Sequence, residues 1–145
     1  MLWATKKRIR IARAATCWLI RRFLDPEAKL VFTGEDDVLR LEREEGALGF
    51  HVKDARYPPV DDRGRIPFET LVEERLPDDP TLLRFARIVR DADRPSRERP
   101  MEPEAAGLRL ISVAFPEVRS DDHVIVAESR LLYDALYCSL RKLVA

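Results

Sequence analysis

The chain has 145 residues, enough for one domain with a buried core, and its 26 basic and 26 acidic side chains cancel to a formal net charge of zero. With 46% hydrophobic and 36% charged residues, its composition is typical of a soluble globular protein. A neutral chain does not favour nucleic-acid binding, and no run approaches the roughly 20 apolar residues of a membrane span.

The N-terminal charges and the cysteines bear on where the protein works. Seven basic residues precede Asp25 and no acidic residue does. Such a segment is typical of a targeting signal, a nucleic-acid or membrane patch, or a solvated basic face, and we favour the last. No uninterrupted apolar stretch follows the charges, so no secretory signal is expected. Cys17 and Cys138 lack metal-type spacing, and without a signal they favour a reducing cytoplasm.

The first part of the chain predicts a short strand, a helix and another strand. Residues 2–5 suit the first strand, and residues 13–26 form one amphipathic helix that ends at an Asp-Pro pair. Trp18 and Phe23 supply most of its apolar face, which we expect to be buried. Residues 28–33 are β-branched and aromatic, as in a strand.

The middle of the chain predicts an acidic helix, a short strand and a loop. Asp36 or Asp37 can cap a helix that runs to residue 45, with Gly46 as its C-terminal stop. Residues 49–52 suit a second short strand. Residues 55–65 contain two prolines and a glycine, and are the most loop-like stretch.

Helices account for most of the remaining chain. Pro67 and the Asp79-Pro80 pair are start signals for two of them. A mostly apolar helix over residues 104–115 is expected to be central. The last helix runs from Ser120 to about residue 144, and its inward stripe is expected to be Ile125, Ser129, Leu132, Leu136 and Leu140. The sequence therefore predicts an α+β fold, a single predominantly α-helical domain over residues 1–145 with a small minor sheet.

The first helix carries the candidate chemistry. The chain has no Gly-rich phosphate loop or Ser-His-Asp arrangement, and its two histidines exclude a His-rich metal site. Arg13 and Arg21 lie one turn either side of Cys17, where they would lower its pKa, so Cys17 is the candidate catalytic residue; alternatively it is a small buried hydrophobe. Arg13, Arg21 and Arg22 offer forked donors for an oxyanion, or pair with surface acids.

Carboxylate and phenol side chains elsewhere complete the candidate set. Glu104 begins the apolar helix, where it either favours the helix dipole or faces a pocket. Tyr133 and Tyr137 lie one helical turn apart, with Asp134 beside them, and they either line a pocket or pack in the core.

Four sequence blocks resemble one known family, in the family's order and spacing. They are WLIRRFLDPEA (18–28), RIVR followed by AD (87–93), PEAAGL (103–108) and LYDALY (132–137). The chain resembles the C-terminal domain of the ChrB-type chromate-resistance family, standing alone. The resemblance implies a link to chromate resistance beside chromate efflux, and longer members are similar to chromate-responsive regulators. It implies no settled catalytic mechanism.

The chain also departs from the family pattern. The cysteine stands one position later than in the family, and the proline before Trp18 is absent. One step along a helix turns a side chain by about 100°, so Cys17 need not point where the family's cysteine does. Residues 61–66 lack the family's histidine and cysteine, so a Cys/His metal or redox site is lost or altered. The residues that do match are Arg13, Trp18, Arg21, Arg22, Asp25, Glu104, Tyr133 and Asp134.

We therefore expect a cytoplasmic accessory or sensing domain that binds an oxyanion or metal ion, rather than an enzyme. Its pocket would lie between the first helix, the 104–115 helix and the last helix. The expected ligand-binding residues are Arg13, Trp18, Arg21, Arg22, Glu104, Tyr133 and Asp134. One alternative is a redox enzyme that reduces chromate through Cys17 or a bound metal; another is an interaction module that partners a regulator or transporter. The sequence does not identify a cofactor.

Overall fold

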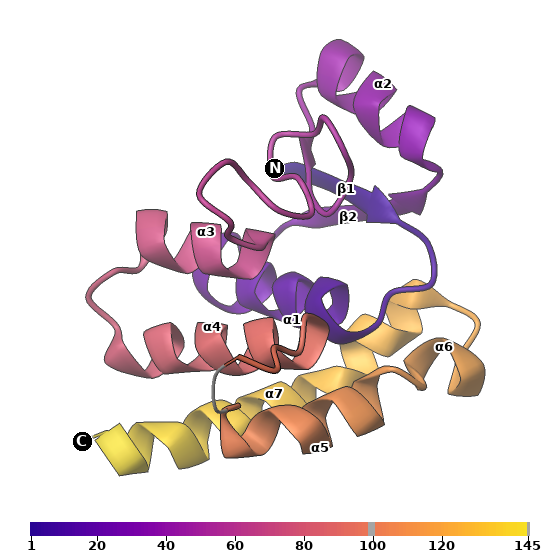
Figure 1. The fold of residues 1–145 in the computed structure, drawn as a ribbon. Helices are drawn as coiled ribbons and strands as arrows, with labels where there is room; N and C mark the ends of the chain where they lie inside the picture. Colours follow the sequence, from indigo (N-terminus) through magenta and orange to yellow (C-terminus); the bar gives the residue numbers. More distant parts are fainter. Residues whose placement is uncertain (99–100, 145) are drawn as a thin grey trace.

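A small parallel sheet lies at one end of the molecule, and helices make up the rest (Figure 1). The computed structural model describes residues 1–98 and 101–144. Its strands are β1 (Leu2–Lys6), β2 (Lys29–Thr33) and β3 (Leu48–Gly49), which are parallel and lie in the order β2-β1-β3. The predicted α+β fold, mainly helical with a minor sheet, is confirmed.

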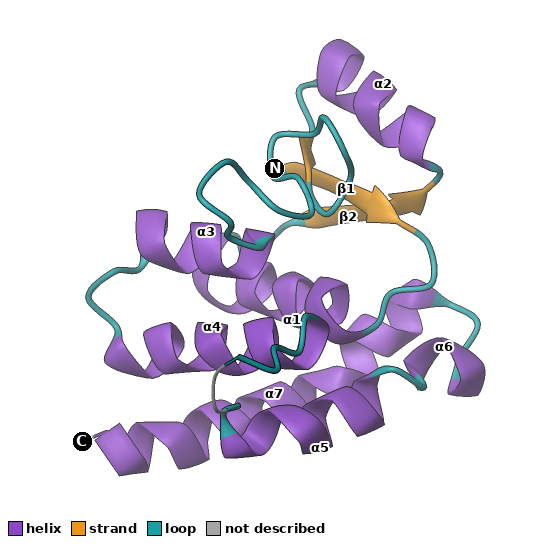
Figure 2. Cartoon of the chain, viewed as in Figure 1, coloured by secondary structure: helices purple, strands orange, loops and turns teal. Residues whose placement is uncertain are grey.

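Successive side chains of β1 face opposite sides of the sheet, so this strand contributes to two cores. Trp3 is 1% exposed and packs in the larger core, among the helices. Ala4 belongs to the smaller core with Val38 of α2 (Glu35–Glu45). Figure 2 shows α2 on one side of the sheet and α1 (Ile11–Leu19) on the other.

The predicted first helix begins at Ile11, two residues earlier than expected, and its last turn is wide. After α1 the chain continues as a π-helical segment, η1 (Ile20–Leu24), and the amide of Asp25 donates to the carbonyl of Ile20 at 2.6 Å. The predicted stop at Asp25 is confirmed. Its carboxylate accepts a hydrogen bond from Trp3 Nε1 at 3.1 Å, which ties the end of this helix to β1.

The helix after β2 begins differently from the prediction. Neither Asp36 nor Asp37 caps α2, because Gly34 occupies the N-cap position. Asp37 instead accepts a hydrogen bond from the Thr33 hydroxyl at 3.0 Å. Gly46 ends the helix at φ 68°, as predicted, since a side chain would be strained in this left-handed conformation.

The strand expected at residues 49–52 is shorter and starts one residue earlier, at Leu48. Phe50, just after it, donates its amide to the Ala4 carbonyl of β1 at 3.0 Å and forms an isolated bridge with Tyr57. Gly49 lets β3 pass close to α2: an added Cβ would lie 2.9 Å from Val38 Cγ1. The following loop, predicted at residues 55–65, is confirmed.

The helices of the C-terminal half form where Pro67 and the Asp79-Pro80 pair predict two of them. Asp79 caps its helix by accepting a hydrogen bond from the Leu82 amide at 3.0 Å. The elements are α3 (Pro67–Arg75), α4 (Pro80–Asp93), α5 (Pro103–Ser112), α6 (Phe115–Val118) and α7 (Asp122–Val144).

The prediction that the 104–115 helix is central is wrong. It ends at Ser112 as α5, and it packs mainly against α4, on the outer side of that helix (Figure 1). Ala105, Leu108 and Ser112, spaced by three and four residues, are its buried face. Leu110 and Ile111 are 76% and 52% exposed. The apolar composition of this helix therefore did not predict which of its side chains are buried.

The long helix α7 crosses the core as predicted, and Ile125, Ser129 and Leu140 of the predicted stripe are buried, but the middle of the buried face is rotated from the prediction. Leu132 and Leu136 are half-buried, and Tyr133 and Tyr137 take the central positions. These tyrosines pack against Trp18 of α1. None of the described helices has the length and apolar character that crossing a membrane requires.

Candidate functional site

Trp18 lies where α1, α4 and α7 meet. Its indole is 4% exposed and stacks on Phe85 of α4 with 4.9 Å between ring centroids. The rings of Tyr133 and Tyr137 lie 5.8 and 6.1 Å from it. The indole Nε1 of Trp18 donates a hydrogen bond to Oδ1 of Asp134 on α7 at 2.8 Å. A buried aromatic cluster thus presents a carboxylate at its rim.

Asp134 collects basic side chains from both helices. Its Oδ1 also accepts a hydrogen bond from Arg22 Nη1 at 2.5 Å, and its Oδ2 accepts one from Arg130 Nε at 3.4 Å. Burial alone would raise the pKa of Asp134, but the hydrogen bonds from Trp18 and Arg22 outweigh it and lower that pKa. Asp134 is therefore a carboxylate at neutral pH.

A cavity of about 390 Å³ opens beside this cluster, and we call it the Trp18 cavity. Its residues come from the end of α1, from η1 and from α7: Trp18, Arg21, Arg22, Pro26, Val126, Ala127 and Arg130. Arg21 donates to the Ala28 carbonyl at 3.3 Å and forms no ion pair with any carboxylate of the described residues. Three guanidiniums therefore line the cavity, and Asp134 binds two of them, those of Arg22 and Arg130, so the cavity is electropositive.

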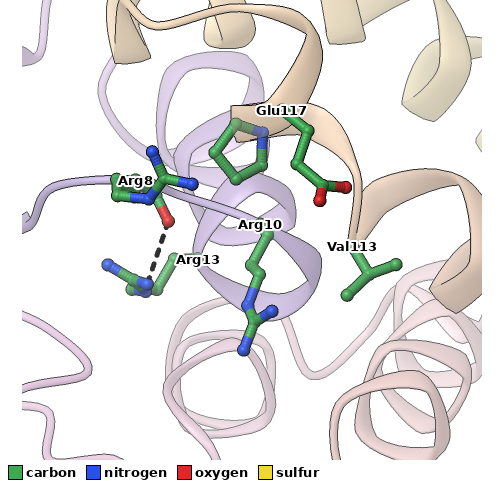
Figure 3. Close-up of a pocket in the computed structure, with 6 residues that line it drawn as sticks. Arg8, Arg10, Arg13, Val113 and Glu117 are labelled. Atoms are coloured by element: carbon green, nitrogen blue, oxygen red, sulfur yellow. Dashed lines mark hydrogen bonds between the residues drawn. The ribbon is translucent and has the colours of Figure 1, made fainter.

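Arg13 does not join this cavity. Its guanidinium donates to the carbonyl oxygens of Lys6, Lys7 and Arg8 at 2.7, 3.0 and 3.1 Å, and so holds the loop between β1 and α1 (Figure 3). Eight residues separate Arg13 from Arg21, which is about 12 Å along a helix. Of the two arginines that flank Cys17 in sequence, Arg13 therefore binds the β1–α1 loop and Arg21 lines the Trp18 cavity.

Glu104 is also elsewhere. It lies in the first turn of α5, where its Oε1 accepts a hydrogen bond from Arg84 of α4 at 2.8 Å. Tyr133 is fully buried, and burial raises the pKa of its hydroxyl. Of the expected ligand-binding residues, the structure brings together Trp18, Arg21, Arg22 and Asp134, with Tyr133 behind the indole.

The family described as "ChrB, C-terminal domain" matches residues 3–140. The chain belongs to this family. Protein ChrB of Cupriavidus metallidurans is 30% identical over 136 residues, which are 93% of this chain and 39% of that protein. The chain thus spans about two fifths of its curated relative's length, and no solved structure matches it. The resemblance read from the four sequence blocks is confirmed.

The thiol of this ChrB-family domain differs from the expectation for a reactive cysteine. Cys17 is fully buried, and burial raises its pKa to about 12 although Arg21 and Arg13 each act to lower it. The free-energy cost of burying a thiolate exceeds its electrostatic attraction to the two arginines, because both guanidiniums are hydrogen-bonded to backbone carbonyls elsewhere. Cys17 is therefore a neutral thiol in the core.

Metal ligands are not grouped in this ChrB-family domain. Within residues 1–98 and 101–144, no three His, Cys, Asp or Glu side chains are placed so that they could hold a metal ion. His51 is largely buried, and burial lowers its pKa to about 3, so its imidazole is neutral.

Sequence reasoning missed Arg130. It lies on α7 one turn before Asp134, and a spacing of four residues between opposite charges is the signal that could have found it. Val126 and Ala127, one turn earlier, form the apolar wall of the Trp18 cavity. The relevant face of α7 thus runs from Val126 to Asp134.

Proposed function

We propose that this ChrB-family domain is a cytoplasmic accessory or sensing protein of chromate resistance, and that it binds a small oxyanion in the Trp18 cavity. The observation that carries the proposal is the convergence of Arg21, Arg22 and Arg130 on one cavity with a single bound carboxylate. Guanidinium forks match the oxygens of a tetrahedral oxyanion and donate charge-assisted hydrogen bonds to them.

Asp134 gives the cavity a means of responding to an anion. An arriving oxyanion competes with this carboxylate for Arg22 and Arg130. Because Trp18 donates to the same oxygen of Asp134 as Arg22 does, a change at Arg22 reaches the hydrogen bond that joins α1 to α7. Binding in the cavity would therefore alter the packing of two helices, which a sensing role requires.

Metal binding and redox catalysis receive less support. Asp134 is already bonded to an indole and two guanidiniums, which disfavour a cation beside it. Cys17 is a buried thiol with a raised pKa, which makes it a poor nucleophile or electron donor at neutral pH.

A protein-interaction module is the second candidate function. Leu110 and Ile111 of α5 and Val118 of α6 are 76%, 52% and 66% exposed. Large apolar side chains grouped on a surface are typical of a contact with another protein. This role is compatible with anion binding in the Trp18 cavity, because the exposed residues are not among those that line it.

A thermal-shift titration with chromate, with sulfate and phosphate as competitors, tests the oxyanion proposal. A saturable rise in melting temperature that prefers chromate would support it, because a ligand of the folded state stabilises that state. No rise with any of the three anions would reject it and favour the interaction module.

A further inference from the structure

A second cavity, of about 440 Å³, lies between the β1–α1 loop and the segment that joins α5 to α6; we call it the loop cavity (Figure 3). Its lining residues are Arg8, Arg10, Arg13, Val113, Pro116 and Glu117. It shares no lining residue with the Trp18 cavity. Its volume lies within the range of small-molecule sites and exceeds the needs of one tetrahedral anion.

The loop that supplies the arginines is held in a strained conformation. Arg8 and Ile11 have φ angles of 61° and 37°, which side-chain-bearing residues rarely adopt. Asp122, in the first turn of α7, holds the loop by accepting hydrogen bonds from the amides of Arg8 at 3.1 Å and Ile9 at 2.8 Å. With Arg13 bonded to three loop carbonyls, the backbone that carries Arg8 and Arg10 is fixed from both sides.

The charges of the loop cavity are unbalanced. The guanidiniums of Arg8 and Arg10 form no ion pair with any described carboxylate, and Arg13 bonds only to carbonyl oxygens. Glu117 lies across the cavity from these arginines (Figure 3) and forms no ion pair with a described basic residue. The carboxylate of Asp122, which is bonded to the loop amides, acts electrostatically on Arg13. The cavity therefore offers the two unpaired guanidiniums of Arg8 and Arg10 on one side and the Glu117 carboxylate on the other.

The position of the loop suggests the class of ligand. In doubly wound parallel α/β sheets, a Gly-rich turn after the first strand binds phosphate through the amides of the next helix, and this chain has no such turn. Here the amide of Ala12, in the first turn of α1, already donates to the carboxylate of Asp93. A phosphate would therefore be bound by the side chains of Arg8 and Arg10, rather than by the helix amides.

We propose that the loop cavity binds an organic phosphate, a small hydroxyl-bearing molecule that carries a phosphate monoester. Its phosphate lies between Arg8 and Arg10, and its hydroxyl groups donate to the carboxylate of Glu117. The fixed loop lowers the ordering cost of binding, because its backbone does not have to rearrange. This site is independent of the Trp18 cavity.

Isothermal titration with ribose 5-phosphate, inorganic phosphate and ribose tests the proposal. Ribose 5-phosphate should bind at least about tenfold more tightly than either part alone, since the site contacts both of its ends. Arg8→Gln and Arg10→Gln should each weaken this binding by about tenfold, and Glu117→Gln should weaken it for ribose 5-phosphate but not for inorganic phosphate. Arg43→Gln, an exposed change on α2, is the matched control.

Several outcomes would overturn the proposal. Equal affinity for ribose 5-phosphate and inorganic phosphate would show no recognition of hydroxyl groups. Undetectable binding of ribose 5-phosphate, or binding that Arg8→Gln and Arg10→Gln leave unchanged, would exclude the site. Loss of binding in Arg21→Gln instead would move it to the Trp18 cavity. Circular dichroism of each variant confirms that the fold is retained, because Arg8 and Arg10 are exposed.

Discussion

Trp18 and Asp134, 116 positions apart in the chain, are joined by a hydrogen bond of 2.8 Å from the indole Nε1 to Oδ1. The same oxygen accepts from Arg22, so one carboxylate is shared between the aromatic core and the basic rim of the Trp18 cavity. Under the proposed function, this sharing couples the strength of anion binding to the packing of α1 on α7.

Replacing Asp134 with Asn should strengthen chromate binding several-fold and weaken the fold. Asn retains an acceptor for Trp18 but removes the charge that competes for Arg22 and Arg130. Because the Asp134 side chain is 30% exposed, we expect a loss of only about 1 kcal/mol in unfolding free energy. Urea unfolding and chromate titration measure the two effects. Weaker binding would show that Asp134 positions the arginines and does not compete for them.

Replacing Arg21 with Gln should weaken chromate binding by about tenfold or more, since a charge-assisted hydrogen bond contributes roughly 1.5–3 kcal/mol. The melting temperature should change little, because the Ala28 carbonyl is the only hydrogen-bond acceptor that Arg21 has among the described residues. Arg43→Gln removes an exposed charge far from both cavities in sequence and serves as the control. If both variants lost the same amount of chromate affinity, the loss would be explained by the change in net charge alone.

Cys17 should resist thiol reagents at pH 8 in the folded protein, while the exposed Cys138 reacts. Burial keeps the Cys17 thiol neutral and out of reach, so its labelling should require unfolding. Mass spectrometry after timed labelling, with and without urea, counts the modified cysteines. Rapid modification of both cysteines without urea would show that the thiol is reachable.

The raised pKa of Cys17 also predicts a loss of stability in alkali. The unfolded thiol ionises near its ordinary value of 9, whereas the folded thiol does so only near 12, so stability falls as the pH rises from about 9 towards 12. Cys17→Ala removes this contribution, and its urea midpoint should decline less steeply between pH 8 and 10. Parallel declines in the two proteins would assign the effect to other groups.

His51 predicts a loss of stability in acid. Burial is the main cause of its pKa of about 3, and repulsion from Arg13 and Lys6 adds to it. The unfolded imidazole takes up a proton near pH 6.5 and the folded one does not, so stability falls as the pH drops from about 6.5 towards 3, by up to a few kcal/mol. Urea midpoints at pH 7, 6, 5 and 4 measure the decline.

The matched variant for this effect is His51→Asn. Asparagine tolerates the left-handed backbone of this position, φ 58°, and does not titrate. It should therefore be less stable than the parent at pH 7 but lose less stability on acidification. A variant that loses as much between pH 7 and pH 4 would contradict the assignment to His51.

The local elements could largely be predicted, because their signals are local. Asp79 followed by Pro80 starts α4, Gly46 ends α2, and Asp25 ends η1. Such signals depend on backbone geometry within a few residues. Spacing also identified the buried face of Trp18 and Phe23, since a helix presents residues three and four apart on one side.

The packing of α5 and the face of α7 could not be predicted, because both depend on which helices meet. Leu110 and Ile111 are as apolar as a core residue, but α5 packs against α4 through a different face. On α7, Tyr133 displaces Leu132 from the centre because Trp18 and Phe85 lie opposite it. The composition of a helix shows how apolar it is, but it does not show which other helices it packs against.

The candidate site was partly predictable for a similar reason. Trp18, Arg21 and Arg22 come from one short stretch, and their proximity follows from the chain itself. Asp134 entered through family resemblance, and its bond to Trp18 is a long-range contact that no local pattern indicates. Arg13, from the same stretch, faces the β1–α1 loop instead because the helix rises and turns between it and Arg21.

The wide turn of η1 explains how two adjacent arginines reach a single cavity. In an α-helix, neighbouring side chains point about 100° apart, which would turn either Arg21 or Arg22 away from α7. In η1 the hydrogen bond joins residues five apart, so one turn contains more residues than a turn of an α-helix. The angle between neighbouring side chains is therefore smaller. Removing one residue from η1 would restore ordinary winding and turn Arg21 further from Arg22, so the shared place of these two arginines in the lining of the Trp18 cavity depends on an extra residue in one helical turn.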